Sequence, residues 1–271
     1  MLVVQPLPAF REGLWMKQIQ YPSRGQQVYG YAHIPAAAAP APALILCHGF
    51  TGAASEGSRL FVHLANAAAK AGFYTLRIDC VGSGNSDADF ADYTCLGGWA
   101  EDVRNGVRFL AAQPEVNACR IGVLGISFGA AAAMLAGQDK QIKAVGGWAS
   151  VIYPEPTFRG ILTDEKWEYL AEGGKRISHV YAGNHFSLCS QFVQDIASLS
   201  IPEAVGRYGN KPLLLMQGDQ DAVIDITHSA KLAELAPCQV EYHLIAGEDH
   251  AFMHHMEENI AVTLDFFRRN L

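Results

Sequence analysis

The stretch "VLGISFGAAAAML", residues 123–135, places Ser127 between Gly125 and Gly129, where an apolar run passes into an alanine-rich run. The first run predicts a strand and the second a helix. Gly-x-Ser-x-Gly at such a join is typical of a sharp turn that lifts the serine hydroxyl clear of a sheet. The flanking residues are small because a Cβ atom at either glycine would collide with neighbouring backbone. The stretch predicts an α/β fold, and it leaves open whether Ser127 is a nucleophile or only a small turn residue.

Further apolar runs on both sides of this stretch have the length of buried strands. Their apolarity is continuous rather than alternating, which is typical of strands covered on both faces in a parallel sheet. Helical segments separate them, and this alternation predicts a doubly wound α/β domain. The expected strands are 43–47, 73–78, 120–125, 143–150, 212–218 and 239–247, and the expected helices are about 58–71, 98–112, 128–137, 227–236 and 254–270.

Two regions depart from this rhythm. Residues 14–35 alternate around the turn "PSRG" and predict an antiparallel hairpin on the sheet edge, followed by a stiff connector, "AAAAPAPA", at 36–43. Between Ser150 and Tyr208 no strong strand is visible, and aromatic residues are spread through short helical segments. We expect residues 151–208 to be an inserted lid subdomain of one domain that spans 1–271. An irregular crossover packed against the core is the alternative.

Composition and charge exclude several classes of protein. Half of the 271 residues are hydrophobic, and 20 basic against 27 acidic residues give a net charge of −7. No Lys/Arg cluster could follow a phosphate backbone, so nucleic acid is not an expected partner. The six scattered cysteines fit neither a disulfide framework nor a zinc site. The first residues, "MLVVQPLPAFREGLW", do not read as a signal or anchor, and we expect a cytoplasmic protein without a membrane partner.

A serine hydroxyl is a weak nucleophile, and its hydrolytic use requires a histidine to take its proton and a carboxylate to orient that histidine. When serine comes first in the chain, the order to look for is Ser, then Asp or Glu, then His. Two later segments meet this requirement, each directly after an expected strand: "GDQDAVID" at 218–225 and "EDHAF" at 248–252. Loops past the carboxyl ends of strands are where α/β sheets hold their ligands.

These motifs together resemble the α/β-hydrolase fold family, and within it the small bacterial esterases of the feruloyl (cinnamoyl) type. The resemblance covers nearly the whole chain. It implies that Ser127 is the nucleophile, Asp221 the acid and His250 the base, with Asp219 as a competitor for the acid. Ile224 and Asp225 stand where the family usually has Val and Pro, a departure that concerns the local turn. The motifs are "CHGFTG" (47–52), "RIDCVGSGNSD" (77–87), "GISFG" (125–129), "GDQDAVID" (218–225) and "EDHAF" (248–252).

The oxyanion formed when Ser127 attacks an acyl carbon needs hydrogen-bond donors already in place. The backbone N–H of Phe128, the residue after the nucleophile, supplies one at the start of a helix. The resemblance points to the backbone N–H of Phe50 as the other. His48 is expected to brace this loop rather than to take part in the reaction.

Other polar residues have a competing functional interpretation. Asp79 with "GSGNS" (82–86) could bind phosphate, but a structural turn beside the active site is favoured. His250, His254 and His255 resemble a helical metal site, yet His250 is needed as the base and no zincin motif is present, so neither metal nor cofactor is expected. In the expected lid, four side chains are candidates to bond the ring substituents of a substrate, with ordinary packing equally favoured: Tyr153, His179, Tyr181 and His185.

The expected function is two-step hydrolysis of a carboxylic ester through an acyl-enzyme, on a small-molecule hydroxycinnamoyl, other aryl or short acyl ester. Acyl-CoA thioesterases, small serine peptidases and acyltransferases share the fold and triad and stay open as alternatives. A serine at position 127 disfavours dehalogenases, which usually have Asp there, and dienelactone hydrolases, which have Cys. A hydrolase-fold binding protein is the non-enzymatic alternative. A homodimer and a monomer are equally compatible with the sequence.

Overall fold

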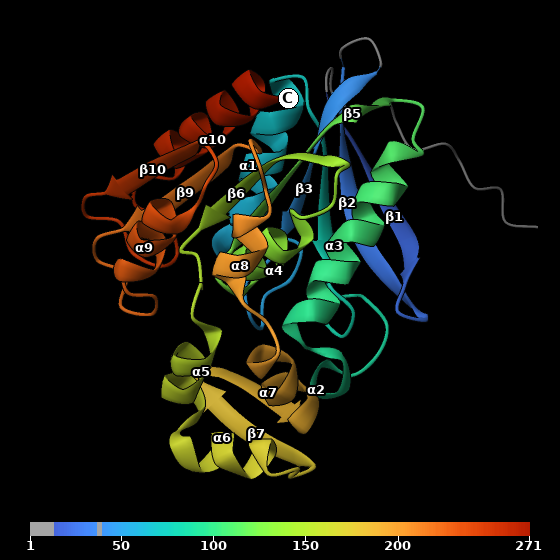
Figure 1. The fold of residues 1–271 in the computed structure, drawn as a ribbon. Helices are drawn as coiled ribbons and strands as arrows, with labels where there is room; N and C mark the ends of the chain where they lie inside the picture. The colour runs from blue at the N-terminus through green and yellow to red at the C-terminus, as the bar shows by residue number, and fades with distance from the viewer. Residues whose placement is uncertain (1–13, 37–39) are drawn as a thin grey trace, which may run out of the picture.

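The computed structural model describes residues 14–36 and 40–271. Residues 1–13, which make up most of the stretch "MLVVQPLPAFREGLW", lie outside the described residues. Residues 37–39 of the expected connector also lie outside them. An eight-stranded sheet runs through the molecule in the order β1-β2-β4-β3-β5-β6-β9-β10 (Figure 1). All neighbours from β4 to β10 are parallel, whereas β2 pairs antiparallel with both β1 and β4. The predicted mostly parallel sheet with an N-terminal edge hairpin is confirmed.

The strands of this sheet are close to the predicted ranges, and β3, β4, β6, β9 and the second half of β5 are almost fully buried. The chain passes from β3 to β4 on one side and then returns to β5 on the other. The carboxyl ends of β3 and β5 are therefore adjacent at the point where the strand order reverses, which is where α/β sheets bind ligands. The bounds are β1 (Leu14–Ser23), β2 (Gln26–Pro35), β3 (Ala41–Cys47), β4 (Tyr74–Asp79), β5 (Val116–Ile126), β6 (Ile142–Trp148), β9 (Leu213–Gly218) and β10 (Val240–Ile245).

Helices cover both faces of the sheet. α1 and α10 pack together on one face, and α3, α4, α8 and α9 form a contiguous row on the other (Figure 1). The predicted helices are all present, with ends shifted by a few residues. Their bounds are α1 (Leu60–Lys70), α3 (Leu96–Ala111), α4 (Phe128–Ala136), α8 (Ile201–Gly206), α9 (Thr227–Leu235) and α10 (Met256–Asn270), with short turns η1 (Gly57–Arg59) and α2 (Phe90–Tyr93).

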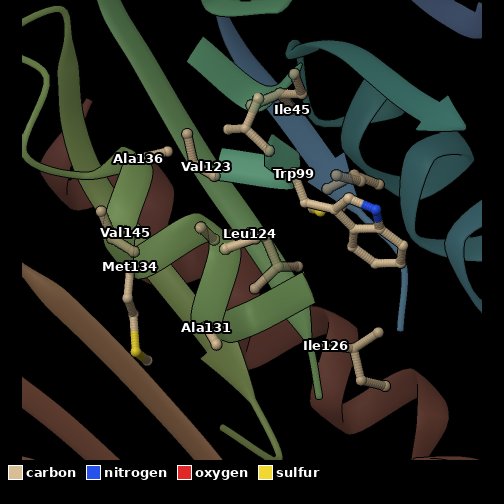
Figure 2. Close-up of a cluster of buried hydrophobic side chains, with 14 of the residues drawn as sticks. Ile45, Trp99, Val123, Leu124, Ile126, Ala131, Met134, Ala136 and Val145 are labelled. Carbon is tan, nitrogen blue, oxygen red and sulfur yellow. The ribbon is translucent and has the colours of Figure 1, made fainter. Parts of the chain in front are cut away.

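The helix that follows Ser127 is buried on all sides. Every residue of α4 is buried, and its alanines allow close packing between β5, β6 and α3 (Figure 2). Trp99 of α3 and Val123 of β5 belong to the same cluster. Because α4 cannot move without opening this core, the start of the helix gives Ser127 a rigid support.

Residues 151–197 form a smaller unit at the end of the molecule far from α10 (Figure 1). It contains α5 (Pro154–Leu162), α6 (Asp164–Ala171), a separate hairpin of β7 (Arg176–Tyr181) and β8 (Asn184–Cys189), and α7 (Ser190–Ala197). The expectation of no strong strand in this region is wrong, because β7 and β8 form a two-stranded sheet. The strands are short and largely polar, so continuous apolarity could not reveal them. α8, inside the expected 151–208 insert, packs against α4 of the main body.

Within the described residues, the structure contains no helix of the length and apolarity that crossing a membrane requires.

Candidate active site

Ser127 occupies the turn between β5 and α4 with φ 55° and ψ −121°. Its N–H donates to the carbonyl of Trp148 at 2.8 Å, which ties the turn to the end of β6. A Cβ atom at Gly125 would collide with the carbonyl of Gly129, and one at Gly129 with the carbonyl of His48. The two glycines therefore permit the sharp turn that the motif predicts.

The loop after β3 runs alongside this turn. The hydrogen bonds of the described loops and helix ends include none donated by the backbone N–H of Phe50 or of Phe128. The N–H of Phe128 lies in the first turn of α4, where the helix dipole favours negative charge. The Phe50 ring packs edge-to-face against Phe128 of the core and Phe158 and Phe186 of the smaller unit, at centroid distances of 5.0–5.7 Å.

Polar side chains, buried at His48 and Asp79 and partly buried at Glu56, hold this loop in place. Both ring nitrogens of His48 are used, Nδ1 with the carbonyl of Gly49 at 2.8 Å and Nε2 with the N–H of Cys80 at 3.1 Å. The Glu56 carboxylate accepts the Gly49 N–H at 2.6 Å. Asp79 accepts the N–H groups of Ala54 and Asn85, as the structural-turn interpretation predicted. His48, Glu56 and Asp79 are braces of the loop.

Asp221 and His250 meet at the carboxyl ends of β9 and β10. His250 Nδ1 lies 2.9 Å from Asp221 Oδ2, and because a carboxylate only accepts, Nδ1 carries the proton and Nε2 is left to accept one. The Asp221 side chain has no exposed surface, and that of His250 is 28% exposed. Burial favours a higher pKa for Asp221, but the hydrogen bond and charge of His250, with the amides of Ile224 and Val223, outweigh burial and lower it. The acid is therefore held as a carboxylate.

Ser127 and His250 border the same two cavities. One, of about 150 Å³, is mostly apolar and is lined by Phe158, Ile161, Tyr181 and Phe186 of the smaller unit together with Phe50. The other, of about 540 Å³, lies on the side of η1. No hydrogen bond joins Ser127 to His250 within the described part of the chain; such bonds are often long without substrate.

The remaining candidates are placed differently. Asp219 is exposed and accepts the N–H of Gly247 at 2.7 Å, whereas Asp221 is the carboxylate bonded to His250. Of the four side chains proposed as substrate contacts, Tyr181 lines the 150 Å³ cavity, and His179 and His185 line a separate cavity of about 830 Å³. Tyr153 packs against His228 and lines neither cavity that contains Ser127.

The structure does not bring His250, His254 and His255 together as a group of possible metal ligands within the described residues. In the described ranges, the group of possible ligands within 4.8 Å of one another is Glu248, Asp249 and His254, without His250. Glu248 is fully buried, and its two oxygens accept the N–H groups of residues 249, 254 and 255 and the side-chain amide of Asn259. The Glu248 carboxylate is thus used as a hydrogen-bond acceptor that fixes the loop of His250.

Two polar residues around the pair were not singled out from the sequence. Gln217, buried on β9, donates to Asp221 Oδ2 at 3.0 Å, and Glu248 holds the His250 loop. A signal existed for Gln217, because it is the polar residue that ends the apolar run "LLLMQG". For Glu248, in a polar loop, the sequence offers no such contrast.

Comparisons with known proteins show which families and structures the chain is similar to. The family model "Serine aminopeptidase, S33" matches residues 38–161, and "BAAT / Acyl-CoA thioester hydrolase C terminal" matches residues 103–236. No curated protein sequence matches the chain. Among solved structures, Est1E from Butyrivibrio proteoclasticus, determined with ferulic acid bound, is 25% identical with a TM-score of 0.82, covering 93% of this chain and 98% of that one.

Two further structures share the fold at lower identity. The esterase domain of a Rhodothermus marinus protein is 22% identical with a TM-score of 0.71, over 94% of this chain and 98% of that one. The Pyrococcus horikoshii acylaminoacyl peptidase is 18% identical with a TM-score of 0.74, over 96% of this chain but 42% of its own length. The sheet order, the serine turn and these matches show that the chain has the α/β-hydrolase fold, and its structure is similar to that of Est1E.

Proposed function

We propose that the protein is a serine carboxylic-ester hydrolase that works through Ser127, His250 and Asp221. The observation that carries this proposal is the 2.9 Å bond between His250 Nδ1 and Asp221 Oδ2, with Ser127 and His250 bordering the same cavities. That bond fixes the tautomer in which Nε2 can take a proton from a hydroxyl.

The reaction has two steps. His250 takes the proton of Ser127 as its Oγ attacks the ester carbonyl, and the amides of Phe50 and Phe128 stabilise the oxyanion. The alcohol leaves with the proton from His250. Water, activated by the same histidine, then attacks the acyl-enzyme, and the acid product leaves with Ser127 restored.

The smaller cavity supports an aromatic acyl group. Its volume is about 150 Å³, and apolar cavities of this size in other proteins bind a single benzene ring. Phe158, Phe186 and Ile161 supply apolar walls, while Tyr181 and Asn184 bring polar groups that can bond ring substituents. A hydroxycinnamoyl or other aryl acyl group fits this chemistry. The structural neighbour with bound ferulic acid supports the same choice. In this proposal residues 151–197 act as the lid.

The larger cavity favours an ester over an acyl-CoA substrate. Its described lining includes the carboxylates of Glu56 and Asp249 and neither lysine nor arginine. An acidic lining repels the phosphates of CoA, whereas a neutral alcohol meets no such repulsion. This separates the proposal from the thioesterase alternative that one family match suggests.

The nucleophile is tested by intact-mass analysis after treatment with a fluorophosphonate probe. We expect one adduct on the wild type and none on Ser127→Ala. A wild type that does not react, or a Ser127→Ala variant that reacts equally, removes the basis of the proposal.

The substrate class is tested by comparing kcat/KM over a panel with matched acyl groups. The panel contains hydroxycinnamoyl, aryl and short alkyl esters, the corresponding CoA thioesters, and aminoacyl amides. We expect aryl and hydroxycinnamoyl esters to lead. A preference of more than about tenfold for thioesters or amides, about 1.4 kcal/mol in transition-state stabilisation, contradicts the esterase assignment.

A further inference from the structure

The carboxylate of Asp221 is held by four hydrogen bonds, and one of them comes from a side chain that the mechanism does not use. Oδ1 accepts the N–H groups of Val223 and Ile224, both at 2.9 Å. Oδ2 accepts His250 Nδ1 at 2.9 Å and Gln217 Nε2 at 3.0 Å. The oxygen that faces the histidine is thus shared with a neutral donor.

Gln217 is itself fixed from three sides. It is fully buried at the end of β9. Its Nε2 also donates to the carbonyl of Ile224 at 3.2 Å, and its Oε1 accepts the hydroxyl of Ser229, buried in α9, at 3.1 Å. Carboxylate and carbonyl oxygens only accept, so the amide must present its NH₂ to them and its oxygen to Ser229. The side chain therefore has one orientation.

We propose that Gln217, oriented by Ser229, is a positioning residue that fixes the Asp221 carboxylate and moderates its pull on the proton of His250. This inference rests on the proposed function, since it concerns how the same triad is tuned. The same side chain also restrains the loop that carries Asp221, because Gln217 Nε2 donates to the carbonyl of Ile224.

The electrostatic consequence has a definite sign. A neutral donor on Oδ2 stabilises the carboxylate charge and weakens the attraction of that charge for a proton on His250. Removing the donor leaves a more negative neighbour, which stabilises the protonated form of His250 relative to its wild-type environment. The acid limb of the pH profile of kcat/KM then moves to higher pH, because His250 must be neutral to act as a base.

Other ionisable groups face this pair. Asp219 and Asp225 lie in the loop of Asp221, Glu248 and Asp249 lie in the loop of His250, and His228 on α9 interacts electrostatically with Asp221. None is changed in the variants below, so a comparison of each variant with the wild type isolates the contribution of Gln217.

The test is the pH profile of kcat/KM for Gln217→Met, which keeps the length of the side chain and removes its donor. We expect kcat to fall about tenfold with KM within about twofold, and the acid limb to move up by roughly half a pH unit or more. Gln138→Met is the matched control, because Gln138 is exposed and its amide donates to the carbonyl of Leu135 in a helix end. It should leave the profile unchanged.

Two further variants keep the inference testable when Gln217→Met does not fold. Ser229→Ala removes the hydroxyl that orients the amide and should move the acid limb in the same direction, by less. Gln217→Glu places a second carboxyl about as far from Oδ2 as the amide, and two buried carboxyls at that distance share one proton. Its activity relative to wild type should therefore decline as the pH rises.

A folded Gln217→Met enzyme with an unmoved acid limb overturns the inference, even if kcat falls equally at every pH, because a merely structural role would do that. A wild type that the fluorophosphonate does not label overturns the proposed function instead. A labelled wild type with an unmoved limb in Gln217→Met sinks only the role of Gln217, so the two failures are distinguishable.

Discussion

Ser127 combines two properties at the scale of the residue: a positive φ and a position at the start of a buried helix. A residue with a Cβ atom adopts φ near 55° only at a steric cost. The turn persists because the N–H of Ser127 is bound by Trp148 and because α4 is packed on all sides. The backbone thus holds Ser127 at the border of the two cavities that His250 also lines.

Substitution of the acid separates Asp221 from its neighbour Asp219. Asp221→Asn removes the acceptor that fixes the tautomer of His250, and we expect kcat to fall by about four orders of magnitude, as it does in serine proteases. Asp219→Asn alters an exposed side chain bonded to Gly247 and should change kcat by less than about twofold. Steady-state kinetics with one aryl ester measure both. The reverse ranking would make Asp219 the acid.

At the scale of the element, the turn between β5 and α4 depends on two glycines because backbone carbonyls occupy the space of their missing Cβ atoms. Gly125→Ala should lower the free energy of unfolding by about 3 kcal/mol or more, since the carbonyl of Gly129 cannot move without distorting α4. Gly160→Ala is the matched control, because Gly160 lies in exposed α5 with open space around it. It should stabilise by about 0.5–1 kcal/mol. Urea unfolding measures both, and equal effects would contradict this account of the turn.

The elements that the sequence predicts well are those with a single strong pattern. Buried strands such as β3 and β9 read as continuous apolar runs, and β1 with β2 alternates around "PSRG". The hairpin of β7 and β8 was missed because one of its faces is polar and exposed. The available signal in the sequence was the pair Gly183-Asn184, which is typical of a hairpin turn, and the structure gives Ala182 and Gly183 a positive φ.

The candidate site also contains residues that a sequence pattern predicts and one residue that it does not. Ser127, Asp221 and His250 follow strand ends in a fixed order, which a pattern can capture. Gln217 acts through contacts with Ile224 and Ser229, which depend on how the acid loop folds back over β9. Such contacts have no fixed spacing in sequence, and only the folded chain reveals them.

At the scale of the whole molecule, one buried histidine couples stability to pH. His33 on β2 bonds Asn66 through Nδ1 and accepts Arg77 Nε at 2.9 Å through Nε2. Burial, with the charge of Arg77, lowers the pKa of His33 to about 4. Because a second proton would have to sit on Nε2, facing a guanidinium, the folded protein keeps this histidine neutral well below the pH at which the unfolded chain protonates it.

The unfolded chain therefore binds more protons than the folded one between pH 6.5 and about 4. The contribution of His33 is fully present above pH 6.5 and is lost as the pH falls through this window, approaching about 1.4 kcal/mol per pH unit in its middle. His33→Gln, which cannot be protonated, should lose less stability than wild type between pH 7 and pH 5 in urea unfolding. Parallel losses in the two proteins would show that His33 does not titrate on unfolding.

The groups proposed to react and the residues that line the apolar cavity come from two different stretches of sequence. The groups proposed to move protons and bind the oxyanion come from loops of the main sheet, whereas residues 154–186 supply most of the apolar wall of the 150 Å³ cavity. Phe50 is one of the contacts between the two parts, because its ring touches both. Substitutions in the smaller unit can thus retune which acyl group is accepted while the reacting atoms keep their support. In such an architecture, substrate preference can change during evolution while the reacting residues stay the same.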